Sequence, residues 1–174
     1  TPHNPPPKPA QDVDTYLNNR TAFPDHIGSW HPSSYRWLLI RAYIPRRTHF
    51  QRVVVVDVRD TMFQSDPFAI LVEPGFYTAK DSERLTMDQE PWNKGWVVDC
   101  FGDQIFRPMA KQYISCSGIS LGTRVEMLAY LDVMGRHILS PLVRKCERNG
   151  VDQGIHNVML HEGLEARERP RPAT

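Results

Sequence analysis

The stretch VVVVDVRDTMFQSDPF, residues 53–68, decides how this sequence is interpreted. Its four consecutive valines, 53–56, are typical of a strand buried on both faces, as in a parallel sheet. Such a strand would deliver Asp57 and Asp60 to its carboxyl end, the edge at which open α/β sheets bind ligands. Carboxylates there suit Mg²⁺ or Mn²⁺, which can bridge a diphosphate. The stretch therefore predicts a metal site, and the simpler alternative is a turn cap at Asp57 and a helix start at Asp60.

Helix and strand signals alternate on both sides of this stretch. Serines before an apolar pattern predict a helix that begins at residue 34, and Pro45 predicts its end. Thr123, with Glu126 three residues later, is typical of the start of a second, long helix. The expected elements are helices over 34–44, 123–146 and 152–161, and strands over 53–56, 69–72 and 113–121. This alternation predicts an α/β fold with a mostly parallel, Rossmann-like sheet and flanking helices.

The two ends of the 174-residue chain differ in composition from its middle. Residues 1–12, TPHNPPPKPAQD, are proline-rich and predict an extended linker or stem. Residues 165–174, EARERPRPAT, are charged and proline-rich and predict a disordered tail. One folded domain is therefore expected over 13–164.

Charge and cysteine content restrict the class of protein. The formal net charge of +1 gives no strong field, so neither nucleic acid nor an anionic membrane is an expected partner. No apolar run approaches the roughly 18 residues of a membrane span. Three cysteines cannot all pair within one chain, and we expect buried thiols, with one disulfide plus one thiol as the alternative. The sequon at Asn19 would accept a glycan in a lumenal protein.

Four sequence blocks, taken together and in order, resemble a family of GT-A-fold glycosyltransferases found in plants, algae and related eukaryotes. The blocks are HPSSYRWLLIRAYI at 31–44, VVVVDVRDTMFQSDPF at 53–68, ISCSGISLGT at 114–123 and CERNGVDQGIHNVMLHEGL at 146–164. The resemblance implies a GT-A fold, a nucleoside-diphosphate-sugar donor, a divalent metal, usually Mn²⁺, and a glycan, protein or small-molecule acceptor. It also favours the Golgi lumen. The first strand–helix half of a GT-A domain is not found before residue 34, so we expect an incomplete domain.

The resemblance assigns roles to residues in the second and third blocks. Asp57 and Asp60 take the place of the family's Asp-x-Asp motif, here spaced Asp-x-x-Asp. Asp60 is expected to bind the metal directly, and Asp57 to contact ribose or a metal-bound water. Arg59, between them, is expected to bind substrate. Ser117 and Gly118 match a segment that lines the sugar pocket, where the hydroxyl would bond a sugar and the glycine would admit it to the backbone.

The fourth block contains an Asp-Gln pair that resembles one near the reaction centre of similar transferases. Asp152 would orient the sugar or act as the base if transfer inverts the anomeric centre, and Gln153 would bond the donor sugar. Alternatively, Asp152 caps the helix that follows the Asn149-Gly150 turn. The expected reaction is transfer of a sugar from its nucleotide to an acceptor hydroxyl with metal assistance.

Two other functions remain open. A degenerate domain of this kind would bind sugar or a partner without turnover. The Gly118–Gly122 segment also satisfies the Gly-x-Ser-x-Gly pattern of serine hydrolases, with Ser120 as nucleophile and Asp152 and His156 or His161 later in the chain.

Aromatic and histidine side chains have simpler interpretations. We interpret both histidines, His156 and His161, as surface or structural residues, because their spacing of five is poor for a helical metal pair. Trp92 and Trp96, four apart, would share one helical face and pack in the core, with stacking on a sugar as the alternative. Trp37 is expected in the core.

Overall fold

The computed structural model describes residues 31–59, 61–70 and 73–161. The predictions for the stem over 1–12, the sequon at Asn19, the tail over 165–174 and the metal ligand Asp60 lie outside the described residues. The helices are α2 Pro32–Tyr43, α3 Pro91–Phe101, α4 Asp103–Met109, α5 Arg124–Ile138, α6 Pro141–Cys146 and α7 Val151–His161. The 3₁₀ helices are η2 Ile44–Arg46 and η3 Pro67–Ile70, and the strands are β1 Arg52–Val56, β2 Phe76–Lys80 and β3 Ser115–Thr123.

The sheet has three strands in the order β1-β3-β2, and β3 pairs antiparallel with both neighbours. The expectation of a mostly parallel, Rossmann-like sheet of GT-A type is therefore wrong for the described residues. The valine run correctly predicted β1, but β-branched residues favour a strand in either direction. Nor is the run buried on both faces: Val53 is buried, whereas Val54, Val55 and Val56 are only half-buried. The direction of the sheet is set by the distant β3.

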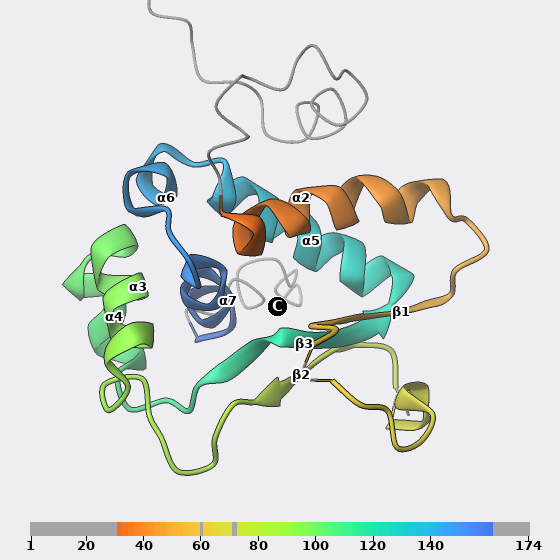
Figure 1. The fold of residues 1–174 in the computed structure, drawn as a ribbon, viewed down its shortest axis with the longest axis horizontal. Coiled ribbons are helices and arrows are strands. Elements are labelled where there is room, and N and C mark those ends of the chain that lie inside the picture. The colour runs from red at the N-terminus through yellow and green to blue at the C-terminus, as the bar shows by residue number, and fades with distance from the viewer. Residues whose placement is uncertain (1–30, 60, 71–72, 162–174) are drawn as a thin grey trace, which may run out of the picture.

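The helices gather on one face of this sheet (Figure 1), with α2 alongside α5, and α5 and α7 against the strands. The core between these layers contains Trp37, Met127, Leu131, Met134, Ile138 and Ile155. A second cluster beneath α3 and α4 contains Met87, Val97, Phe106, Met109, Ile114 and Val158. The expectation that Trp37 packs in the core is confirmed, since its exposure is 0%. Within the described ranges, no helix is long and apolar enough to cross a membrane.

The long helix expected over 123–146 is two helices, α5 and α6. Its start is as predicted, because the Thr123 side chain accepts a hydrogen bond from the Glu126 backbone N–H. Its continuity is not, because Pro141 has no backbone N–H to donate within a helix. Pro141 instead occupies the first turn of α6, where Ser140 caps the new helix.

Other differences concern the middle of the chain. The strand expected over 69–72 is wrong where the structure describes it, since residues up to Ile70 belong to η3. Three elements in this region, β2, α3 and α4, had no clear prediction. The start of α3 did carry a signal, because Glu90 accepts hydrogen bonds from the backbone N–H groups of Trp92 and Asn93, and Pro91 follows it.

The cysteines divide into one pair and one thiol. Cys100 on α3 and Cys146 at the end of α6 form a disulfide, with their Cα atoms 5.3 Å apart, and Cys116 is free. The expectation of three thiols is therefore wrong and its alternative holds. The reason is the packing of α3 against α6, which brings two distant cysteines within bonding range.

Candidate functional site

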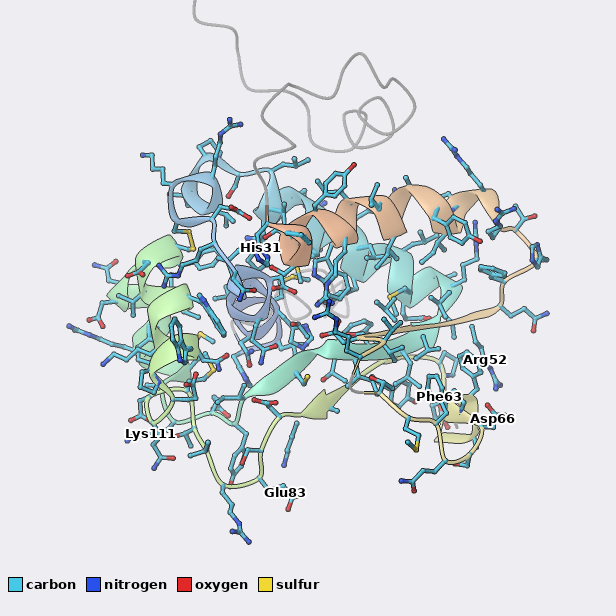
Figure 2. The ribbon with its side chains drawn as sticks, viewed as in Figure 1. His31, Arg52, Phe63, Asp66, Glu83 and Lys111 are labelled. Carbon is cyan, nitrogen blue, oxygen red and sulfur yellow. A yellow bond between two sulfur atoms is a disulfide. The ribbon has the colours of Figure 1, made fainter. Side chains whose placement is uncertain are left out.

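A cavity of about 540 Å³ opens where six segments meet, a volume typical of sites for small organic ligands. They are the start of α2, the residue after β1, the residue after β2, the strand β3, the start of α3, and the start of α7 with the turn before it; Figure 2 draws the side chains of these elements. The cavity is lined by Ser33, Arg36, Asp57, Asp81, Glu90, Trp92, Asn93, Trp96, Cys116, Ser117, Gly118, Asn149, Gly150, Asp152 and Gln153. Several helix and strand ends thus face one another across a polar space.

Most of the predicted site residues that the structure describes line this cavity. They are Asp57, Ser117, Gly118, Asp152 and Gln153. Arg59 does not line it, because it lies exposed in the turn after β1. The structure therefore brings all four sequence blocks to one place, since Ser33 and Arg36 of the first block also line the cavity. The roles assigned to the predicted residues stay predictions.

Asp152 forms the floor of the cavity. It lies in the first turn of α7, and only 2% of its surface is exposed. Its Oδ2 accepts hydrogen bonds from Arg36 Nη2 at 2.8 Å and Trp37 Nε1 at 3.1 Å, with Ser117 Oγ at 3.4 Å. The carboxylate thus points into the protein and not along the helix end, unlike the capping role considered from the sequence.

Arg36 joins the two aspartates that the sequence singled out. Its guanidinium forms ion pairs with Asp57 through Nη1 and with Asp152 through Nη2. Burial lowers the pKa of Arg36, but the charges of Asp152 and Asp57 outweigh this, and the pKa is raised. Arg36 is therefore a permanent cation between two acids. Arg36 carries no sequence signal for this role, because Asp152 lies 116 residues further along the chain. The two meet only when α2 packs beside α7.

Asp57 lies in a more open place than Asp152. Its side chain is 41% exposed, and it follows directly after the edge of β1. A Cβ atom added to Gly118 would lie only 2.8 Å from Asp57 Oδ2. The glycine therefore makes room for a carboxylate of the protein itself, which differs from the expected approach of a sugar to the backbone.

Gln153 ties α7 to the sheet. Its Oε1 accepts a hydrogen bond of 2.6 Å from the backbone N–H of Ser117. Four residues further along α7, Asn157 bonds both the N–H and the C=O of Ser115. These bonds fix the segment of β3 that carries Ser117 and Gly118 against the start of α7.

The two tryptophans of α3 have different environments. Trp96 packs closely against α7 and the turn before it. A Cβ atom added to Gly150 would lie 2.1 Å from the Trp96 ring, and one added to Gly154 would lie 2.7 Å from the Trp96 Cβ. Trp92 is 68% exposed, with its ring centroid 6.3 Å from that of Trp96. The core-packing expectation is therefore wrong for Trp92, and Trp96 is half-buried at the cavity and belongs to neither core cluster.

A buried polar chain supports the cavity from below. His156 is fully buried, its Nδ1 lies 2.8 Å from Tyr130 Oη, and its Nε2 lies 2.9 Å from Ser115 Oγ. Burial, with a small contribution from His161, lowers the pKa of His156 to about 3, so the ring is neutral. The structural interpretation of this histidine fits its position. His161 likewise bonds the carbonyl of Tyr113.

The expected metal site has few ligands in the part of the chain that the structure describes. There, no group of three or more His, Cys, Asp or Glu side chains is placed to hold an ion. The Asp57 carboxylate is already paired with Arg36. Because Asp60 lies outside the described residues, the metal site expected at Asp57 and Asp60 stays a prediction.

The serine-hydrolase alternative lacks its geometry. Ser120 lies within β3, not on a strand-to-helix turn, and is fully buried. Its Oγ has no hydrogen-bond partner among the described residues. His156 is bonded to Ser115 and Tyr130 instead.

Comparisons with protein-family models, with curated proteins and with solved structures give no match for this chain. Function is therefore indicated by the cavity and by the sequence blocks that supply its lining residues. The lining offers carboxylates, amides, hydroxyls and indole faces, and this mixture is suited to a ligand with several hydroxyl groups and an apolar ring face.

Proposed function

We propose that this cavity binds the sugar of a nucleoside-diphosphate sugar, and that the chain takes part in transfer of that sugar to an acceptor hydroxyl. The observation that carries the proposal is convergence. Three segments that the sequence blocks predict as binding segments supply Asp57, Ser117 with Gly118, and Asp152 with Gln153 to one cavity of about 540 Å³. That volume is adequate for one sugar ring together with part of the group attached to it.

The hydrogen bonds around Asp152 support a binding role for this residue. All three hydrogen bonds to Asp152 that involve described residues use Oδ2, so Oδ1 is left to accept from a sugar hydroxyl. Because Arg36 and Trp37 hold the carboxylate in one orientation, its geometry is set before a ligand enters. Orientation of the sugar is therefore the role of Asp152 that we favour over that of a base.

Calorimetric titration of the folded chain with UDP-sugars and GDP-sugars tests this proposal. We expect binding that weakens by about tenfold in Gln153→Ala and in Asp152→Asn, because each change removes one hydrogen-bonding group worth roughly 1.5 kcal/mol. Asp132→Asn is the matched control, since Asp132 pairs with Arg41 and does not line the cavity. A folded chain that binds none of these donors contradicts the proposal.

Mn²⁺ is a separate variable in the same titration. The sequence blocks imply a metal at Asp57 and Asp60, and Asp60 lies outside the described residues. We expect binding to strengthen with Mn²⁺ in the parent chain and to lose that dependence in Asp60→Ala. Equal affinity with and without Mn²⁺ rejects the metal while leaving the sugar site in place.

Binding without turnover is a second candidate function. The observation that favours it is the pairing of Asp57 and Asp152 with one guanidinium, which leaves neither acid unpaired near a reacting group. A donor that binds but yields no product with any acceptor, and no hydrolysis, supports a sugar-binding module. Product formation supports the transferase.

A further inference from the structure

The cavity carries an excess of negative charge. Four of its lining residues are acids, Asp57, Asp81, Glu90 and Asp152, and Arg36 is the one basic residue among the described residues that line it. Arg36 is already shared between two of the acids. Burial raises the pKa of Glu90, but hydrogen bonds from the backbone and side chain of Asn93 and from the backbone of Trp92 outweigh it, so the pKa is lowered and Glu90 is ionised near neutrality. A carboxylate on the sugar ring inside the cavity would therefore meet an excess of acids in the lining.

The part of the lining that α3 supplies is aromatic. Trp92 presents an indole that is 68% exposed, although large apolar side chains are normally covered, and it lines the cavity beside Trp96. The ring faces of sugars carry C–H groups that pack on indole surfaces, whereas their edges carry hydroxyls. An exposed indole beside carboxylates and amides thus matches the two sides of a sugar ring.

Unsatisfied polar atoms lie in the same wall. Asn93 is 4% exposed and lines the cavity, and its Oδ1 has no partner among the described residues. The same is true of Trp96 Nε1, which lies one turn further along α3. Both atoms are enclosed by protein and neither faces the open cavity, so the match to a sugar is carried by the acids of the lining and the exposed Trp92.

We infer that the cavity selects neutral sugars against acidic ones, with Trp92 as the face on which the sugar ring packs. This inference rests on the proposed function, because it concerns the sugar that the same cavity takes. It names the substrate class: a neutral hexose or pentose unit, not a uronic acid. The carboxylates accept hydroxyl protons from a neutral ring and repel a carboxylate on an acidic one.

Matched donor pairs test the selection. UDP-glucose and UDP-glucuronic acid differ only at C6, as do UDP-galactose and UDP-galacturonic acid. We expect the neutral member of a pair to bind at least about tenfold more tightly, because like charges about 5 Å apart at a protein surface repel by more than 1 kcal/mol. The ratio should shrink in 1 M salt and in Asp81→Asn, which removes one of the acids from the lining.

Variants of Trp92 test the aromatic face. Trp92→Ala should weaken binding of the neutral donor by about fivefold, and Trp92→Phe by less, since a stacked ring contributes roughly 1 kcal/mol. Tyr43→Ala is the matched control, because Tyr43 is 52% exposed and does not line the cavity. Unfolding of each variant in urea, measured alongside, shows that the chain remains folded.

The possible outcomes separate the two proposals. Preference for neutral donors together with loss of binding in Trp92→Ala supports the selection. Equal or tighter binding of the uronic-acid donors, or full affinity in Trp92→Ala, overturns it while the proposed function stands. Absence of binding for every donor in folded protein overturns both.

Discussion

Asp152 and Asp57, the two acids that Arg36 joins, belong to two walls of the cavity that are built in different ways. Asp152 lies at the start of a helix that is locked to its neighbours, is 2% exposed and accepts bonds from three side chains. Asp57 lies at the end of a three-stranded sheet's outer strand, is 41% exposed, and its carboxylate is paired with Arg36. The same guanidinium bridges both, so the difference lies in their surroundings.

What surrounds Asp152 is a helical block. The Cys100–Cys146 disulfide ties α3 to α6, and Trp96 packs directly on Gly154 of α7 and on Gly150 in the turn before it. No comparable tie is described for the turn after β1. One acid of the pair is thus enclosed by packed helices, whereas the other is partly exposed and held by Arg36 and by its backbone bond to Gly118. The following predictions test that difference.

The largest effect is expected from the disulfide. Its sequence separation of 46 residues corresponds to about 4 kcal/mol of chain entropy in the unfolded state. Reduction, or the double change Cys100→Ser with Cys146→Ser, should lower the free energy of unfolding by about that amount in urea. Thiol titration of the unreduced, unfolded chain should find one group, Cys116. Three reactive thiols without reductant contradict the pairing, and Cys116→Ser serves as the control with little change.

The next effect compares the two aspartates directly. Asp152→Ala leaves Trp37 Nε1 without its acceptor and Arg36 with one carboxylate fewer, which should cost about 3 kcal/mol of unfolding free energy. Asp57→Ala removes the exposed end of the bridge and should cost less than about 1 kcal/mol. Urea denaturation of both variants measures the difference. Equal costs would show that the walls are equally rigid.

These two walls were not equally accessible to sequence reasoning. The strands β1 and β3 and the helices α2 and α7 were predicted close to their observed places, because each depends on local patterns of apolar and capping residues. The predicted parallel direction of the sheet was wrong. β1 pairs antiparallel with residues 119–123, a contact between distant parts of the chain that the valines themselves do not determine. The break at Pro141 shows a local signal that outweighs a continuing apolar period.

The candidate site divides in the same way. Asp57 could be named in advance because it follows a strand signal, whereas Gly118 and Asp152 were named only through the resemblance of their sequence blocks. Arg36 could not, because its position beside two acids exists only after α2 packs against α7. The exposure of Trp92 was likewise hidden, since its spacing from Trp96 is equally typical of a buried face.

A smaller effect tests the contact of Trp96 with α7. Gly150 and Gly102 both have positive φ, 83° and 85°, so alanine is strained at either position. An added Cβ meets nothing within 4 Å at Gly102 but lies 2.1 Å from the Trp96 ring at Gly150. Gly150→Ala should therefore destabilise by about 2 kcal/mol more than Gly102→Ala. Similar losses in the two variants, measured in urea, would mean that Trp96 moves aside freely and that α7 is not locked.

The smallest effect, when only the one pH unit from 6.5 to 5.5 is compared, is the pH dependence that His156 contributes beneath Asp152, about 1 kcal/mol over that unit. Its pKa is lowered from 6.5 to about 3, so below pH 6.5 the unfolded chain takes up a proton that the folded chain does not. Its stabilising contribution is present above pH 6.5 and is lost as the pH falls toward 3, at about 1.4 kcal/mol per pH unit. His156→Gln should reduce this slope by about one proton, while the lowered pKa values of His137 and His161 leave a remainder. An unchanged slope in His156→Gln would show that the ring is already accessible to protons, and that the helical wall opens more readily than its packing indicates.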